Sequence, residues 1–191
     1  MPAEQLIDAA TVVLVEGVSD QRAVIALAAR CGRDLRAESV AVLPMNGATN
    51  IGHFLRRYGP PGQDVRLAGL CDLAEMRFFQ KALESAGMGN ASTVGDLENH
   101  HFFVCDADLE DELIRALGVG RVEQILAEHG DLASFRILQQ QPAQQGRSDH
   151  ARLRRFMGTR GGRKIQYAPL LVDALDLAAL PRPLGRLVSV I

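Results

Sequence analysis

Residues 11–20 read Thr-Val-Val-Leu-Val-Glu-Gly-Val-Ser-Asp, and this stretch decides the fold class. Its first five residues form a β-branched, apolar run that is typical of a buried parallel strand. Gly17 then allows a turn, and the Ser-Asp pair after it is of the type that begins a helix. Two carboxylates, Glu16 and Asp20, therefore follow the strand. In open α/β sheets ligands and metals bind at this edge.

Strand and helix signals alternate through the first half of the chain, which predicts a parallel sheet with crossover helices. We expect strands over residues 11–16, 40–43, 65–71 and 101–105, and helices over 19–31, 49–58, 75–86 and 108–117. Residues 87–98 are expected to form an irregular loop. The fold class is thus α/β, with a small Rossmann-like parallel sheet of about four strands.

Beyond Gly118 the pattern changes to helices without clear strands, expected over 119–129, 131–140, 148–157 and 163–178. The sequence Pro-Arg-Pro at 181–183 is expected to end the last helix. We therefore predict two parts. Residues 1–118 form the α/β core, and residues 119–191 form a helical C-terminal extension that packs on it.

The chain has 191 residues, of which 47% are hydrophobic and 23% charged, as is ordinary for a water-soluble protein. No apolar stretch approaches the ~20 residues that cross a bilayer. Glu4 and Asp8 precede the first apolar run, which argues against a secretory signal. The three cysteines form no Cys-x-x-Cys pair, as expected for reduced thiols. We expect a cytoplasmic protein with no membrane partner.

Acidic side chains follow three of the predicted strands: Glu16 and Asp20 the first, Asp72 the third, Asp108 and Glu110 the fourth. Because these strand ends share one edge, the carboxylates should converge, with oxygens of Glu16 and Asp72 within about 8 Å. A hard divalent cation would relieve their repulsion, and Mg²⁺ or Mn²⁺ suits oxygen ligands. The lack of clustered Cys and His argues against zinc. Two ions about 4 Å apart could support phosphodiester cleavage.

Each acid also has an ordinary structural explanation. Asp20 and Asp108 could satisfy helix N-termini, and Glu110 could be a solvated helix residue. Glu16 and Asp72 are harder to explain in this way, because an ionised carboxylate at a buried strand tip is costly without a partner.

Basic residues gather later in the chain, where seven of the eighteen residues 147–164 are Arg or Lys. Five of the seven residues 106–112 are acidic. This segregation fits a cation site beside a phosphate-binding surface, and two solvated faces are the alternative. We expect these arginines to contact phosphates: Arg152, Arg154, Arg155, Arg160 and Arg163. Few aromatic residues lie among them, which favours the phosphate backbone over the bases.

Only two lysines, Lys81 and Lys164, occur against nineteen arginines. A compact ammonium can stabilise charge that develops on a phosphorane, a role that guanidinium fills poorly. Chance retention at a helix start is the alternative for Lys164. The histidines show no ligand spacing, and no Gly-x-Ser-x-Gly turn supports serine hydrolase chemistry.

The Glu-Gly pair at 16–17, the Gly47 turn after the second strand and Asp72 after the third resemble the Toprim fold, the metal-binding catalytic domain of topoisomerases, primases and several nucleases. The Glu-Gly-x-Ser-Asp form, with its second acid at Asp20, is most similar to the overcoming-lysogenisation-defect (OLD) nucleases. The resemblance covers residues 11–176.

OLD nucleases also have an acidic motif after the fourth strand and a late lysine followed, four residues on, by a small residue. Asp108-Leu109-Glu110 and Lys164 with Ala168 match these elements. The resemblance implies Mg²⁺- or Mn²⁺-dependent cleavage of nucleic acid, with DNA as the expected substrate. It implies Glu16 and Lys164 as catalytic residues, and as metal ligands Glu16, Asp20, Asp72, Asp108 and Glu110.

The sequence departs from this family at two points. Ala74 stands where the Asp-x-Asp motif after the third strand has its second aspartate, so Glu75 is expected to substitute as a ligand, or one metal binds weakly. No Gly-x₄-Gly-Lys-Ser/Thr phosphate loop occurs, so we expect no ATP site in this chain, and any ATPase subunit would act in trans.

The sequence thus predicts metal-dependent phosphodiester hydrolysis of nucleic acid. One alternative is a non-catalytic Toprim-like module, whose broken motif leaves a surface for nucleic acid or a partner protein. Nucleotidyl transfer, as in primases, is a third possibility and would require a nucleoside triphosphate and a template.

Overall fold

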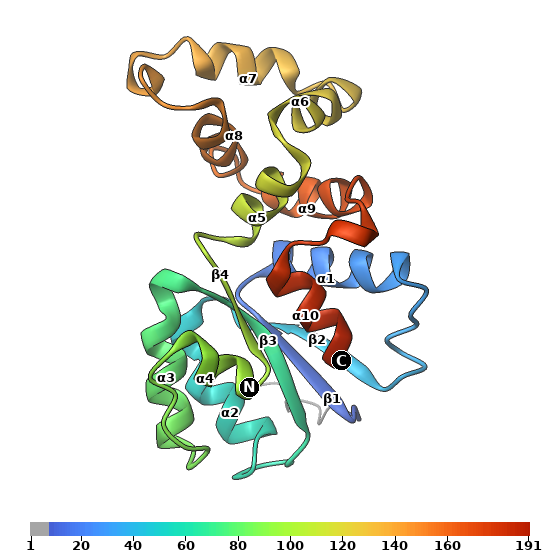
Figure 1. The fold of residues 1–191 in the computed structure, drawn as a ribbon, viewed down its shortest axis with the longest axis vertical. Helices are drawn as coiled ribbons and strands as arrows, with labels where there is room; N and C mark the ends of the chain where they lie inside the picture. The colour runs from blue at the N-terminus through green and yellow to red at the C-terminus, as the bar shows by residue number, and fades with distance from the viewer. Residues whose placement is uncertain (1–7) are drawn as a thin grey trace.

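The computed structural model describes residues 8–191, so Glu4 lies outside the described residues (Figure 1). Its sheet has four strands, β1 (Thr11–Val15), β2 (Val40–Pro44), β3 (Arg66–Asp72) and β4 (Phe102–Cys105). They run in the order β2-β1-β3-β4 and every pair is parallel. The predicted α/β class and four-stranded parallel sheet are confirmed.

Helices cover both faces of the sheet (Figure 1). One face packs against α1 (Val18–Arg30) and α10 (Arg182–Val190), and the other against α2 (Ile51–Tyr58), α3 (Met76–Ser85) and α4 (Val94–Asn99). Successive side chains of β1 point to opposite faces of the sheet, which explains this arrangement. Val13 and Val15 lie in the core shared with α1 and α10, whereas Val12 and Leu14 lie in the core shared with α2, α3 and α4. Since both faces are buried, every residue of the strand after Thr11 is apolar.

The remaining helices lie beyond the carboxyl ends of the strands, in the upper part of Figure 1: α5 (Leu109–Leu117), α6 (Val119–Glu128), α7 (Leu132–Gln139) and α8 (Asp149–Met157). The chain then returns in α9 (Arg163–Asp173), which packs along α1. α10 contacts β3 and β4. The carboxyl edge of the sheet therefore lies between the sheet below and α5, α8 and α9 above (Figure 1). The division of the chain at residue 118 stays a prediction.

The expectation of an irregular loop over 87–98 was wrong, because α4 begins inside it. Thr93 Oγ1 accepts a hydrogen bond from the Asp96 amide at 3.1 Å, and the Asp96 carboxylate accepts one from the Thr93 amide at 2.8 Å. This is a capping box with Asp in place of the usual Glu or Gln. The short helix that follows has too few turns to show a periodic pattern.

The end of the chain also differs from the expectation. α9 ends at Asp173, and residues 177–179 form a separate 3-10 turn, so the expected helix over 163–178 is too long. The Pro-Arg-Pro sequence begins α10 and does not end a helix. Proline is tolerated in the first turn, where its missing N–H would have no partner in the helix. Within residues 8–191, no helix has the length and hydropathy required to cross a membrane.

Candidate metal centre

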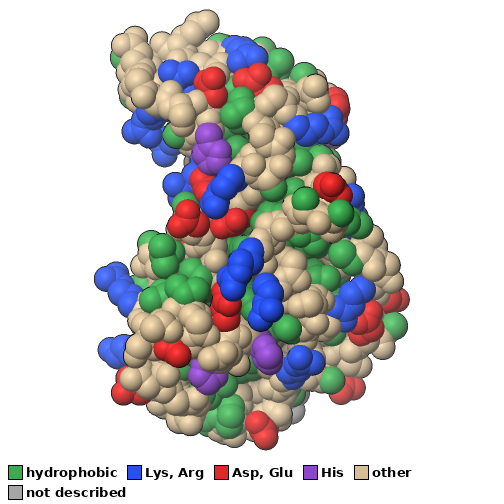
Figure 2. Space-filling model, in the orientation of Figure 1, with side chains coloured by type: hydrophobic (Ala, Val, Ile, Leu, Met, Phe, Trp, Pro, Cys, Tyr) green, Lys and Arg blue, Asp and Glu red, His purple; other side chains and the backbone are tan. Residues whose placement is uncertain are grey.

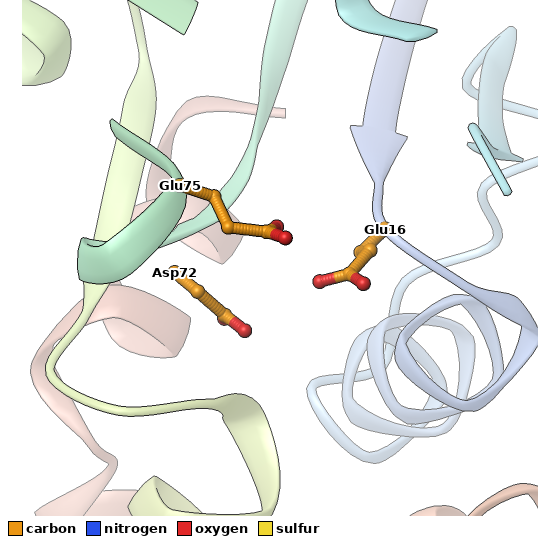
Figure 3. Close-up of side chains that lie close together, drawn as sticks. All are labelled: Glu16, Asp72 and Glu75. Atoms are coloured by element: carbon orange, nitrogen blue, oxygen red, sulfur yellow. The ribbon is translucent and has the colours of Figure 1, made fainter. Parts of the chain in front are cut away.

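Three carboxylates from two neighbouring strands meet at the carboxyl edge of the sheet. Glu16 directly follows β1, Asp72 is the last residue of β3, and Glu75 ends the 3-10 turn after it. Figure 3 shows the three side chains pointing toward a common space. One carboxylate oxygen from each lies within 4.8 Å of the others. The expected proximity of Glu16 and Asp72 is thus confirmed, and Glu75 joins them.

Crowding and burial change the acidity of these groups. Burial, reinforced by the charge of Glu16, raises the pKa of Asp72 to about 8. Burial and then the charge of Glu110 raise the pKa of Asp20 to about 7. The pKa of Glu16 is raised as well, by burial and by the neighbouring charge of Glu75. Without a cation, the site therefore retains protons near neutral pH.

The donor set fits a hard divalent cation. Glu75 Oε2 is buried and has no hydrogen-bond partner among residues 8–191, an arrangement that costs free energy unless a proton or cation binds there. The cluster is made of oxygen ligands, as Mg²⁺ and Mn²⁺ prefer. Cys71 is adjacent, but burial raises the pKa of its thiol far above the usual range, so it does not offer a thiolate.

Asp20 combines the two functions considered for it. Its Oδ2 accepts a hydrogen bond from the Gly17 amide at 2.9 Å, as expected of a helix N-terminal carboxylate. Asp20 also lines the cavity that Glu16 and Asp72 line. Asp20 could therefore bind an ion in one of two ways: with its hydrogen bond from the Gly17 amide intact, or in exchange for that hydrogen bond.

Asp108 and Glu110 reach the same cavity from the start of α5, but each is already paired. Asp108 Oδ1 caps the helix by accepting from the Asp111 amide at 2.8 Å, and its Oδ2 accepts from Arg154 Nε at 2.9 Å. Buried Glu110 accepts from Lys164 Nζ at 2.8 Å. The two acids are therefore neutralised by cations of the protein.

Lys164 projects from the first turn of α9 into the same region, where its Nζ also lies 3.9 Å from Asp108 Oδ2. Burial lowers the pKa of this ammonium, but the charges of Glu110 and Asp108 outweigh that effect and raise it. Lys164 therefore stays charged at physiological pH.

Of these side chains, the ones that line a cavity of about 420 Å³ are Glu16, Asp20, Asp72, Asp108, Glu110 and Lys164. Glu75 instead lines a smaller cavity that shares Glu16, Asp20 and Asp72 with it. Asn46 and Gly47 also line the larger cavity, and Asn46 is not among the site residues predicted from the sequence. Gly47 has φ of +114°, which glycine adopts readily, and its amide donates to the Glu16 carbonyl at 3.1 Å. This hydrogen bond joins the turn after β2 to the carboxyl end of β1. The Asn-Gly pair, typical of tight turns, was the available signal for Asn46.

The arginines expected to contact phosphates have different environments. Arg163 is only 7% exposed, its guanidinium lies over the Phe156 ring, and it donates to the Phe156 carbonyl and to Thr159 Oγ1. Its expected role as a phosphate contact is therefore corrected: it holds α9 against the end of α8. Arg152 donates to the Gln144 carbonyl and pairs with Asp149, and is partly buried.

Arg154, Arg155 and Arg160 are exposed. Arg154 and Arg155 lie at the end of α8 that faces the cavity wall, and both line a pocket that adjoins it. Arg160 lies in the turn between α8 and α9.

The pKa values predict how stability changes with pH. Asp72 and Asp20 bind protons more tightly in the folded state than in the unfolded state, so their contribution is greatest at low pH and is lost as pH rises through about 7–8. We expect the melting temperature of the metal-free protein to fall between pH 6.5 and pH 8. Differential scanning fluorimetry in EDTA measures this, and a rising melting temperature over that interval would contradict the protonation of the site.

Residues 9–64 match the family model described as "Overcoming lysogenization defect protein-like, TOPRIM domain". The structure of the C-terminal region of the Xanthomonas campestris pv. campestris OLD protein, phased with mercury, is similar to this chain at 20% identity, with a TM-score of 0.74. The similarity covers 96% of this chain and 95% of that one. Residues 9–64 therefore match an OLD-like Toprim domain, and the chain as a whole shares the fold of the C-terminal region of an OLD protein.

The C-terminal region of the Burkholderia pseudomallei OLD protein is similar at 18% identity, over 95% of this chain and 96% of that one, with a TM-score of 0.69. These likenesses extend the OLD-like fold across α5 to α10. No curated protein matches the sequence of this chain. Glu16, Asp20 and Gly47 of the candidate centre belong to the part that matches the Toprim model, whereas Asp72 and Lys164 lie beyond it.

Proposed function

We propose that this chain is a nuclease that uses a divalent cation to hydrolyse phosphodiester bonds in nucleic acid, with DNA as the expected substrate. An OLD-like Toprim domain suggests a nucleic-acid-related function. The observation that supports hydrolysis is the group formed by Glu16, Asp72 and Glu75, whose carboxylate oxygens lie within 4.8 Å of one another. Such a group is unstable when fully ionised and is suited to bind Mg²⁺ or Mn²⁺.

In this proposal Glu16, Asp72 and Glu75 hold one cation, and Asp20 lies where it can hold a second. A bound divalent cation lowers the pKa of water and neutralises charge on phosphate oxygens. Asp108 and Glu110 would join as ligands only if their ion pairs with Arg154 and Lys164 opened.

Lys164 and Glu16 carry the catalytic roles. Hydrogen bonding to Glu110 holds the Lys164 ammonium at the cavity wall, where it can stabilise negative charge that develops on the phosphate. Glu16 lies in the cluster itself, where a carboxylate can accept a proton from the attacking water.

Cleavage of supercoiled plasmid with Mn²⁺ tests the proposal. We expect wild type to convert supercoiled plasmid to nicked or linear forms, EDTA to abolish the reaction, and Asp72→Asn to slow it by at least about 10². Asp173→Asn, at an exposed site on α9, is the matched control and should cleave like wild type. Cleavage that persists in EDTA, or that survives in Asp72→Asn, would exclude this centre as the source of activity.

A non-catalytic binding module is the second candidate, and two observations favour it. Lys164 and Arg154 already neutralise the acids that follow β4, and Ala74 replaces the second acid after β3. In this alternative the chain binds plasmid in Mn²⁺ without cutting it, so the same assay with a gel-shift measurement separates the two functions. An ATPase subunit acting in trans stays a prediction.

A further inference from the structure

A second pocket, of about 350 Å³, adjoins the cavity of the candidate metal centre. The two share Asp108 and Lys164 in their linings. Most of the remaining lining comes from α8 and the residues on either side of it, with Arg147, Arg154 and Arg155 among them. Figure 2 shows basic side chains and a histidine gathered above the hollow on the left of the molecule. An acidic cavity and a basic pocket thus lie side by side.

The basic pocket holds positive charge that the protein does not neutralise. Arg154 pairs with Asp108, and Lys164 pairs with Glu110. Arg147 and Arg155 are exposed, and neither side chain has a hydrogen-bond or ion-pair partner among the described residues. Two guanidinium groups at one concave surface attract an anion, and their planar forks match the oxygens of a phosphate group.

A histidine and an aspartate complete the wall. His150 Nε2 lies 2.6 Å from Asp111 Oδ1, which fixes the imidazole ring at the pocket. Nδ1 of His150 has no hydrogen-bond partner within the part of the chain that the structure describes, so it remains available to a ligand. No Phe, Tyr or Trp lines the pocket, which favours recognition of phosphate over stacking on a base.

We propose that this pocket binds a second phosphate group of the nucleic-acid strand, next to the phosphate held at the metal centre. The inference rests on the proposed function, because the shared lining of Asp108 and Lys164 would let one strand cross from the acidic cavity into the basic pocket. Arg147 and Arg155 bind the phosphate oxygens, and His150, positioned by Asp111, contacts the same group. The chemistry fits either a terminal monophosphate or an internal diester.

Imidazole NMR in EDTA tests the pocket without metal and without hydrolysis. We expect inorganic phosphate and thymidine 5′-monophosphate to shift the His150 resonance, assigned by its loss in His150→Gln, and thymidine to leave it unchanged. The dinucleotide thymidylyl-thymidine distinguishes the two sources, because it shifts His150 only if the pocket accepts an internal diester. No shift of His150 with any of the phosphate probes, or an equal shift with thymidine, would overturn the inference.

A double variant tests whether Arg147 and Arg155 bind the phosphate. Arg147→Ala combined with Arg155→Ala should weaken phosphate binding by about tenfold or more. Arg36→Ala combined with Arg66→Ala removes the same charge from exposed residues that line neither cavity, and should change the affinity by less than about twofold. Equal weakening in both double variants would mean a diffuse charge effect and would contradict a built site.

The two proposals fail in different ways. If the chain binds phosphate at His150 but leaves plasmid intact in Mn²⁺, the proposed nuclease activity is contradicted and the proposed phosphate pocket is supported. If the chain cleaves plasmid but shows no phosphate-dependent shift at His150, the proposed phosphate pocket is contradicted and the proposed nuclease activity is supported.

Discussion

Lys164→Ala should lower turnover in Mn²⁺ by roughly 10²–10³ and leave the affinity for Mn²⁺ nearly unchanged. The ammonium lies at the cavity wall, 2.8 Å from Glu110 Oε2, and outside the carboxylate cluster that we expect to bind the cation. Removing it therefore removes charge stabilisation of the reacting phosphate but no metal ligand. Plasmid cleavage at saturating DNA measures turnover, and calorimetric titration measures Mn²⁺ binding.

Three further variants make this result specific. Lys81→Ala, at the other lysine and on the exposed side of α3, should behave like wild type. Lys164→Arg should recover little activity, because a planar guanidinium does not reproduce a compact charge. Lys164→Ala leaves buried Glu110 without its cation and will melt at a lower temperature, so Lys164→Ala with Glu110→Gln should recover stability but not turnover.

The opposite result has a definite meaning. If Lys164→Ala weakens binding to DNA but retains wild-type turnover at saturating substrate, Lys164 belongs to the phosphate-binding surface. Its catalytic assignment is then wrong.

Asp72→Asn should make the metal-free protein more stable at pH 8 and abolish its stabilisation by Mn²⁺. Asp72 is partly ionised at that pH beside Glu16 and Glu75, and the amide removes this repulsion. We expect an increase of a few degrees in melting temperature, since about 1 kcal/mol corresponds to roughly 2–4 °C in a chain of this size. Scanning fluorimetry with and without millimolar Mn²⁺ measures both effects.

The gain in melting temperature of Asp72→Asn should depend on pH. This dependence distinguishes the relief of charge repulsion from a change in packing. At pH 6, below the pKa of about 8, the wild-type Asp72 is already protonated, so the variant should have little advantage. Asp173→Asn should show no gain at either pH and should keep the stabilisation by Mn²⁺. Equal Mn²⁺-induced shifts in Asp72→Asn and wild type would show that the ion binds elsewhere.

The sequence was sufficient to predict the sheet and the edge where the acids meet. Residues 12–15 are apolar at every position because both faces of β1 are covered, and this local pattern determined the class of fold. The positions of Glu16 and Asp72 then followed from the direction of parallel strands. Glu75 was anticipated from the missing acid at Ala74, and the structure places it in the cluster.

Features that depend on distant contacts could not be predicted in the same way. His150 pairs with Asp111 across 39 positions, and Arg154 with Asp108 across 46, so no local spacing shows either pair. The phosphate role expected for Arg163 failed for a related reason. Charge density along a sequence does not distinguish an exposed arginine from one that is buried over an aromatic ring.

We propose above all that Glu16, Asp72 and Glu75 bind a divalent cation. Anomalous diffraction from a crystal soaked in Mn²⁺ tests it most directly. We predict a manganese peak between these three side chains, with carboxylate oxygens at about 2.0–2.2 Å from the ion. A map with no peak among them at saturating Mn²⁺, or with peaks only at other acidic residues, would contradict the account.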